Sequence, residues 1–365
     1  MERRTFLKSA GVATTVGISG LAGCLGNGNG NGDDDDDSGA AGDDDFPTDS
    51  LTWMIPWGEG GGTDQYARQL APLVEEELGE SVPIDNREGA GSMVGAEWLS
   101  EQDNDGYTFG TINSAGGHFT WSAQNAQTEM AFHIEEDFEP IAYSGVFGYT
   151  LIVNNDEAEE HGIDDFASLR DAYADGDISG FGYQGAGSDS HLTTLLLRDE
   201  YGLEYDNAVP YDGGGPTQEA VISDEVGAGF ATNTSAVSAE ESGEASAVVN
   251  LMDIDLDGVF PGIDSITNYG DSLAWITEFY QVQVAPPDTP EDERQEISDA
   301  IQYACEHEET QEWMEETGNI VEYGDMDAAA EQYVGSVDAI EENVDEAIGG
   351  FDEFQRMAEE AEEDE

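Results

Sequence analysis

Apolar residues after position 50 follow two periods, one typical of buried strands and one typical of amphipathic helices. Residues 51–55 and 107–112 are short apolar runs with the length of strands. Residues 65–78 instead carry apolar side chains at helical spacing, and Gly79 follows them, which is a favourable helix end. Repeated strand–turn–helix units of this kind predict an α/β fold with a mostly parallel sheet.

A second set of strand–turn–helix units begins after residue 154. Two strands are predicted just before this point, within 138–153. Further strands are predicted at 178–183, 208–211, 228–231, 247–251 and 277–285. Surface helices are predicted at 291–306, 309–317 and 327–358, the last broken near residues 349–350. The two sets predict a first domain at 49–153, a second domain at 154–250, and a return of 251–365 to the first domain.

A glycine-rich turn connects the first strand to the first helix. It reads Pro56-Trp57-Gly58-Glu59-Gly60-Gly61-Gly62-Thr63-Asp64. The first backbone N–H groups of a helix lack partners and, with the helix dipole, favour an anion. We therefore predict that this turn binds part of a small ligand, although most glycine clusters are only tight turns.

A similar turn, Gly185-Ala186-Gly187-Ser188, precedes a predicted helix in the second set. Ser188 would also be a favourable N-cap, and His191 would then be a packing or capping residue. The alternative is a hydrolase in which Ser188 and His191 are nucleophile and base. However, the chain lacks the GxSxG motif of the common hydrolase turn.

The acidic composition excludes several classes of function. The chain of 365 residues has 83 acidic and 9 basic residues, a net charge of −74, and its one lysine is Lys8. Nucleic-acid binding needs Lys and Arg, and a nucleotide-binding P-loop needs a lysine. The acidic residues are spread along the chain rather than clustered, which indicates a surface adapted to concentrated salt, as in halophilic archaea.

The first 48 residues predict export. Arg3-Arg4 and the apolar stretch over 9–23 resemble a twin-arginine signal, and Leu21-Ala22-Gly23-Cys24 resembles a lipobox. We predict a signal peptide at 1–23, lipidation of Cys24, and an acidic flexible tether at 24–48. The folded part would then be anchored by lipid at the extracellular face of the membrane. Cys305, at helical spacing, is predicted to be a core residue.

Metal and cofactor sites find little support. The five histidines are scattered without HExxH or paired spacing. The glycine motif at 89–95 has one residue too many for a dinucleotide fingerprint. No cofactor is predicted.

Four motifs in order carry a family resemblance. They are the turn at 56–64, Asn86-Arg87-Glu88-Gly89-Ala90-Gly91, Asp105-Gly106-Tyr107-Thr108 and Val209-Pro210-Tyr211-Asp212-Gly213-Gly214. Together they resemble the substrate-binding proteins of tripartite tricarboxylate transporters, the TctC or Bug family. The segment at 285–291 is similar to the strand-to-helix turn of that family.

This resemblance implies a two-domain, periplasmic-binding-protein-like (type II) fold that closes on a ligand like a Venus flytrap. It implies a monomeric receptor without enzymatic activity that delivers a small organic carboxylate to two membrane subunits. The ligand would be held mainly by backbone amides and water. The implied ligand-binding residues are Trp57, Gly58, Gly60, Gly61, Gly62, Thr63, Asp64, Asn113, Ser114, Gly185, Ala186, Gly187, Ser188, His191 and Tyr211. Glu59 would oppose an anionic ligand unless its side chain points to solvent.

Overall fold

The structure is a computed structural model that describes residues 46–59, 62–185, 187–211 and 213–363. The predicted signal peptide, Cys24 and most of the predicted tether lie outside the described residues, and so do the predicted ligand contacts Gly60, Gly61 and Ala186.

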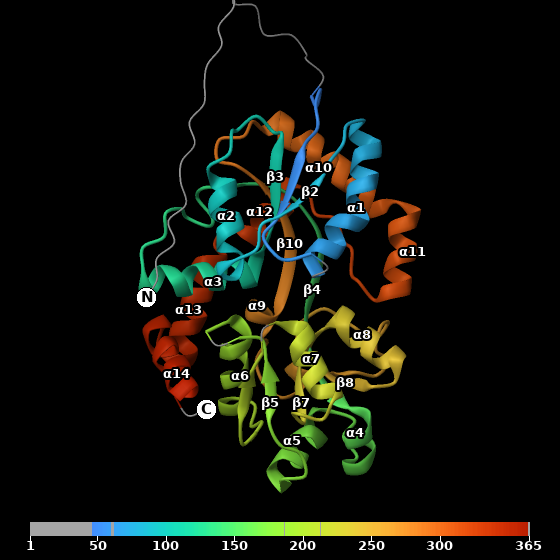
Figure 1. The fold of residues 1–365 in the computed structure, drawn as a ribbon, viewed down its shortest axis with the longest axis vertical. Coiled ribbons are helices and arrows are strands. Elements are labelled where there is room, and N and C mark those ends of the chain that lie inside the picture. Colours follow the sequence, from blue (N-terminus) through green and yellow to red (C-terminus); the bar gives the residue numbers. More distant parts are fainter. Residues whose placement is uncertain (1–45, 60–61, 186, 212, 364–365) are drawn as a thin grey trace, which may run out of the picture. The chain divides into compact units, whose positions relative to one another are not determined.

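Ten strands of the described part form one sheet with the order β2-β1-β3-β10-β4-β7-β5-β6, while β8 pairs with β4 and β9 with β8 (Figure 1). Their bounds are β1 Thr52–Ile55, β2 Ile84–Asn86, β3 Thr108–Asn113, β4 Glu139–Asn154, β5 Phe181–Tyr183, β6 Ala208–Pro210, β7 Ala228–Thr232, β8 Ala245–Asn250, β9 Asp264–Ser265 and β10 Glu278–Ala285. We call the part around β1, β2 and β3 the first lobe and the part around β5, β6 and β7 the second lobe.

The strands within each lobe are parallel, as predicted. β1 pairs in parallel with β2 and β3, and β5 pairs in parallel with β6 and β7. The strands that join the lobes are antiparallel to their neighbours: β10 to β3 and β4, and β4 to β7 and β8. The sequence suggested two strands at 138–153, whereas the structure has the single long strand β4, which belongs to both lobes (Figure 1).

Helices cover both faces of the sheet. Their bounds are α1 Gly62–Leu78, α2 Met93–Ser100, α3 Ser114–Gln127, α4 Asn155–His161, α5 Phe166–Asp175, α6 Asp189–Asp199, α7 Gly214–Ile222, α8 Asn233–Ser242, α9 Ala274–Thr277, α10 Glu291–Glu306, α11 Glu308–Thr317, α12 Met326–Tyr333, α13 Ser336–Ile348 and α14 Phe351–Glu363. The helix predicted at 327–358 is three helices. It breaks at Gly349, as predicted, and also at Gly335, and both glycines have positive φ.

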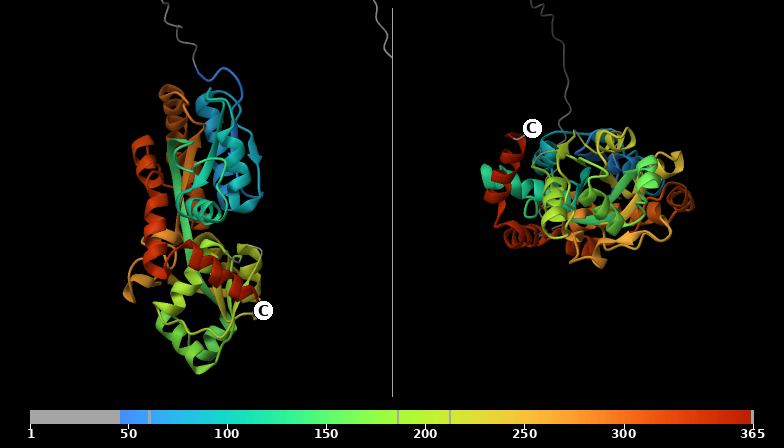
Figure 2. Two further views of the ribbon diagram at one scale, coloured as in Figure 1. Left: turned by 90° about the vertical axis from the view of Figure 1, so that its left-hand side faces the viewer. Right: turned by 90° about the horizontal axis from the view of Figure 1, so that it is seen from below.

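Buried apolar residues form several clusters, one of which spans both lobes. In the first lobe, α1 and α10 cover one face of the sheet, where Trp53, Phe109 and Ile301 are buried together. Cys305 is 3% exposed in that cluster, which confirms it as a core residue. Phe181 and Phe230 of the second lobe are buried in a cluster that also contains Phe119 of α3 and Phe354 of the C-terminal helix α14. Phe354 packs on both Phe119 and His191, so α14 lies against both lobes (Figure 2).

A bulge in β4 shapes the junction of the lobes. Val146 pairs with Tyr280 and Tyr143 pairs with Val282, so two residues of β4 lie opposite the single residue Gln281. One of the two is Gly145, with φ of +151°, where an added Cβ would lie 2.5 Å from the carbonyl oxygen of Ile320. The bulge therefore needs a glycine at this position.

Candidate functional site

The turn before α1 is held in place by a buried carboxylate. Asp64 is 1% exposed and accepts hydrogen bonds from Arg68 Nε at 2.7 Å and from Asn86 Nδ2 at 2.9 Å. Asn86 Nδ2 also donates to the carbonyl oxygen of Trp57 at 2.9 Å. Asp64 thus ties the two ends of the turn to β2, so these contacts position the turn.

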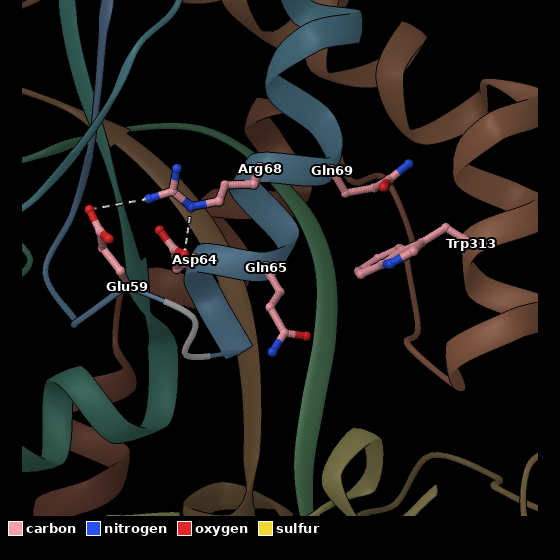
Figure 3. A pocket seen from close by; sticks show the side chains of 6 residues that line it. All are labelled: Glu59, Asp64, Gln65, Arg68, Gln69 and Trp313. Carbon is pink, nitrogen blue, oxygen red and sulfur yellow. Dashed lines mark hydrogen bonds and ion pairs between the residues drawn. The ribbon is translucent and has the colours of Figure 1, made fainter. Parts of the chain in front are cut away.

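The remaining described residues of this turn have different surroundings. Trp57 is half-buried against the first-lobe core, and Gly58 lies so close to Glu88 that an added Cβ would be 2.6 Å from its carboxylate. The Glu59 side chain is 81% exposed and lies 3.8 Å from Arg68, so it points to solvent, as an anionic ligand would require. A surface cavity of about 580 Å³ opens beside it along α1 and reaches Trp313 (Figure 3).

The turn before α6 is organised by Ser188, its N-cap. Ser188 Oγ accepts from the backbone N–H of His191 at 3.2 Å and donates to the carbonyl oxygen of Gly185 at 2.8 Å. Gly185 and Gly187 have φ of +88° and +77°, which glycine adopts readily. The turn therefore places the N-terminus of α6 at this end of the second lobe.

His191 packs against Tyr183 and accepts a hydrogen bond from the turn before α6. Its ring stacks on Tyr183 with centroids 4.7 Å apart, and its Nδ1 accepts from the backbone N–H of Gly187 at 3.1 Å. Burial lowers the pKa of His191 to about 4, so the ring is neutral at pH 7. Ser188 Oγ bonds the backbone of His191 rather than its ring, so these two residues do not form a nucleophile–base pair.

A carboxylate that the sequence analysis did not identify lies next to this turn. Asp189, the first residue of α6, accepts a hydrogen bond from the Tyr149 hydroxyl of β4 at 3.0 Å. Burial raises the pKa of Asp189 to about 6, and hydrogen bonds from Tyr149 and from backbone N–H groups partly oppose the rise. Asp189 thus joins the second-lobe turn to the strand that connects the lobes.

Both turns border one cluster of aromatic rings, formed by Phe147, Phe279 and Tyr149, which we call the aromatic floor. A Cβ added to Gly62 would lie 3.9 Å from the Phe147 ring. Phe147 packs on Phe279 with centroids 5.3 Å apart, and Phe279 packs on Tyr149 at 5.0 Å. Tyr149 then bonds Asp189 in α6. The N-terminal ends of α1 and α6, which are far apart in the sequence, are therefore linked through three rings.

Buried polar side chains lie next to the aromatic floor, in contact with the first turn. Thr63 Oγ1 donates to Asn113 Oδ1 at 3.4 Å, and Asn113, the last residue of β3, pairs with Gln281 of β10. Thr63, Asn113 and Gln281 are all at most 4% exposed. Gln281 was not predicted from the sequence, because only the pairing of β3 with β10 brings it to the site.

The side chains of two further predicted residues have neighbours outside this floor. Ser114 borders a separate cavity of about 260 Å³ with Glu278, Tyr280 and Gln332. The Tyr211 hydroxyl donates to Glu225 at 3.2 Å. The aromatic floor therefore links Gly62 to the Ser188 turn, and Thr63 contacts Asn113, whereas the side chains of Ser114 and Tyr211 have other described neighbours.

Neither a cluster of metal-ligating side chains nor a membrane-spanning helix occurs among the described residues. No cluster of three or more His, Cys, Asp or Glu side chains that could hold a metal ion occurs among them. Within the same residues, each helix is too short or too polar to cross a bilayer.

Two α/β lobes joined by long strands, with the N-termini of α1 and α6 both bordering the aromatic floor, define a periplasmic-binding-protein-like receptor fold. Residues 66–341 match the model of the tripartite tricarboxylate transporter family receptor, TctC, and the chain belongs to this family. The family consists of substrate-binding receptors rather than enzymes, and the alternative of a hydrolase is not supported.

Individual relatives agree with this assignment. A protein of Pseudomonas sp. (strain P51), the UPF0065 protein in the tcbD-tcbE intergenic region, is 28% identical over 188 residues, which cover 50% of this chain and 52% of that protein. The structure of R. palustris Rpa4515 with adipate has a TM-score of 0.69 at 21% identity and covers 83% of this chain and 98% of that one. MatC from Rhodopseudomonas palustris with bound malate has a TM-score of 0.64 at 22% identity, with 81% and 100% covered. These relatives are bacterial and give no support to an archaeal source.

Proposed function

We propose that this receptor captures a small organic carboxylate between the turn at 56–64 and the turn at 185–191. The observation that carries the proposal is that the N-termini of α1 and α6 border the same aromatic floor. Backbone N–H groups at a helix start favour an anion. Two similar structures, described with malate and with adipate, support the same ligand class.

The arrangement of positive charge supports binding by dipoles. Six arginines follow Cys24, and Arg68, the one that borders the first turn, is bound to Asp64 and Asn86. A carboxylate in the site would therefore be held by backbone amides and water. A hydrogen bond bridged by an ordered water is nearly as favourable in enthalpy as a direct one.

The delivery step follows from the family. The sequence predicts hinges near Asn154 and Leu251, at the predicted domain boundaries. Because Asn154 is the last residue of β4 and pairs within the second lobe, we infer that the hinge lies where β4 passes between the lobes, near Tyr149 and Leu251. The receptor would close there and pass the ligand to two membrane subunits. Lipidation of Cys24 would keep the receptor at the extracellular face of the membrane, and the net charge of −74 would keep it soluble in concentrated salt.

Titration calorimetry of the exported chain with a panel of small organic acids in multimolar salt tests the proposal. We expect saturable binding without turnover, weakened by Ser188→Ala. The control is Asp165→Ala, which removes the N-cap of α5 in the same lobe and should leave affinity unchanged. The proposal is wrong if no acid binds, or if both variants lose affinity equally.

A separate experiment tests the anchor. Cys24→Ser should release the exported protein from membranes into the soluble fraction. A variant that still sediments with membranes would contradict lipidation as the means of attachment.

A further inference from the structure

We propose that Asn113 and Gln281 select the ligand by hydrogen bonding to a hydroxyl group, so that hydroxycarboxylates bind in preference to unsubstituted acids. This inference depends on the proposed function and names the substrate class of the same site. It starts from three side-chain atoms that are buried and have no hydrogen-bond partner among the described residues: Asn113 Nδ2, Gln281 Nε2 and Gln281 Oε1.

The burial of these atoms makes the lack of partners costly. Asn113 is 3% exposed and Gln281 is fully buried. A buried polar atom without a partner costs about 1–3 kcal/mol, and most such atoms in proteins are paired. Since three occur on two adjacent side chains, the geometry points to a polar guest that completes them.

The position of the pair fits a ligand contact. Asn113 and Gln281 are paired residues of β3 and β10, so their side chains lie on one face of the sheet. On β10 the next residue on that face is Phe279, which belongs to the aromatic floor. Thr63 of the first turn donates to Asn113 Oδ1. The pair therefore lies between the first turn and the aromatic floor.

The chemistry of the free atoms specifies the guest. Gln281 Oε1 needs a donor, while Asn113 Nδ2 and Gln281 Nε2 need acceptors. A hydroxyl supplies both functions, whereas a carboxylate only accepts and an ammonium only donates. Both amide atoms of Gln281 are unpaired, so the conclusion is the same for either orientation of that amide. A water molecule also donates and accepts, and the experiment separates it from a ligand hydroxyl.

Gln283 is the matched control. It lies two residues further along β10 on the same face and is 1% exposed. Its Nε2 donates to Ser144 Oγ at 2.9 Å and to Thr111 Oγ1 at 3.4 Å, and Thr111 Oγ1 also accepts from Trp53 Nε1. Its Oε1 has no partner among the described residues, so the control differs from Gln281 in having the NH₂ end of its amide paired within the protein. Gln283 is therefore embedded in the core of the first lobe, away from the turn.

The experiment compares malate with succinate, which differ by one hydroxyl, by calorimetry in multimolar salt. We expect the unmodified protein to prefer malate by at least about tenfold, because succinate would leave the amides unpaired. Gln281→Met, similar in length but without an amide, should abolish the preference mainly by weakening malate. Gln283→Met should retain it. If Gln281→Met does not fold, Gln281→Asn, which withdraws the amide by one methylene, replaces it.

Each outcome decides between the alternatives. Equal affinity of the unmodified protein for malate and succinate would show that the amides do not recognise the ligand hydroxyl, and it would overturn the inference while leaving the proposed function intact. Retention of the preference in the folded Gln281 variant would also overturn it. If the unmodified protein binds no organic acid in the wider panel, the proposed function itself fails.

Discussion

Replacement of Asp64 by Asn tests whether this residue positions the first turn. The Asp64 carboxylate uses one oxygen to accept from Asn86 and the other to accept from Arg68. An asparagine of the same shape has one oxygen and one NH₂ group. The NH₂ group would therefore face a donor, and one of the two bonds would be replaced by a repulsive contact.

The loss can be worked out from burial. The carboxylate is 1% exposed, and a hydrogen bond to a buried charged group contributes about 1.5–3 kcal/mol. The Arg68 side chain is 48% exposed, so its ion pair adds at most about 1 kcal/mol. We expect Asp64→Asn to lower the free energy of unfolding by about 2–4 kcal/mol. Ligand affinity should fall as well, because Asn86 would no longer hold the turn through Trp57.

The assay is urea unfolding at constant multimolar salt, which keeps the screening of the acidic surface fixed. Arg68→Gln is the control and should cost less than about 1 kcal/mol, because it removes only the half-exposed partner. If Asp64→Asn is as stable as Arg68→Gln, the buried carboxylate does not anchor the turn and this reasoning is refuted.

Three further predictions concern charge. Burial raises the pKa of Asp189 to about 6, so Asp189 binds a proton more tightly in the folded state, and its contribution to stability is lost as pH rises from about 4 to 6. Asp189→Asn should therefore raise the melting temperature at pH 7 and tighten carboxylate binding. An unchanged melting temperature would contradict this. Burial lowers the pKa of His118 to about 4, so stability should be lost as pH falls from 6.5 to 4. His118→Gln should make the melting temperature less dependent on pH over this range. An unaltered pH dependence would refute this prediction. With a net charge of −74, the melting temperature should rise steeply with added NaCl at fixed pH, and a flat salt dependence would show that self-repulsion is unimportant.

The apolar periods predicted most of the elements, because each strand and helix buries one face. The long strand β4 was predicted as two strands, since Ser144, Gly145 and Gly148 interrupt its apolar run and resemble a turn. The structure shows why glycine is needed there: an added Cβ at Gly148 would lie 2.3 Å from the carbonyl oxygen of Thr277. Close packing where the lobes join therefore produces a pattern that looks like a break in the strand.

The site was predicted in part, and the missing part has a common cause. The turns at 56–64 and 185–188 are local motifs, so sequence reasoning could find them. Asp189 and Gln281 gain their positions from contacts with distant residues, Tyr149 and Asn113, and isolated Asp and Gln residues carry no local signal. Pairing of β10 with β3 was not predictable from periodicity, which identifies strands but not their neighbours.

The composition also favours recognition by buried amides. At 1 M salt the Debye length is about 3 Å, so attraction between exposed charges contributes little to affinity or selectivity. Hydrogen bonds within a buried site are screened far less, and an unpaired buried amide penalises the wrong ligand at any salt concentration. A chain with six arginines after Cys24 and a net charge of −74 has few cations to use for selection, whereas Asn113 and Gln281 are neutral. Discrimination between malate and succinate should therefore be nearly independent of salt, and a preference that falls as NaCl is raised from 1 to 4 M would show that charge rather than the amide pair selects the ligand.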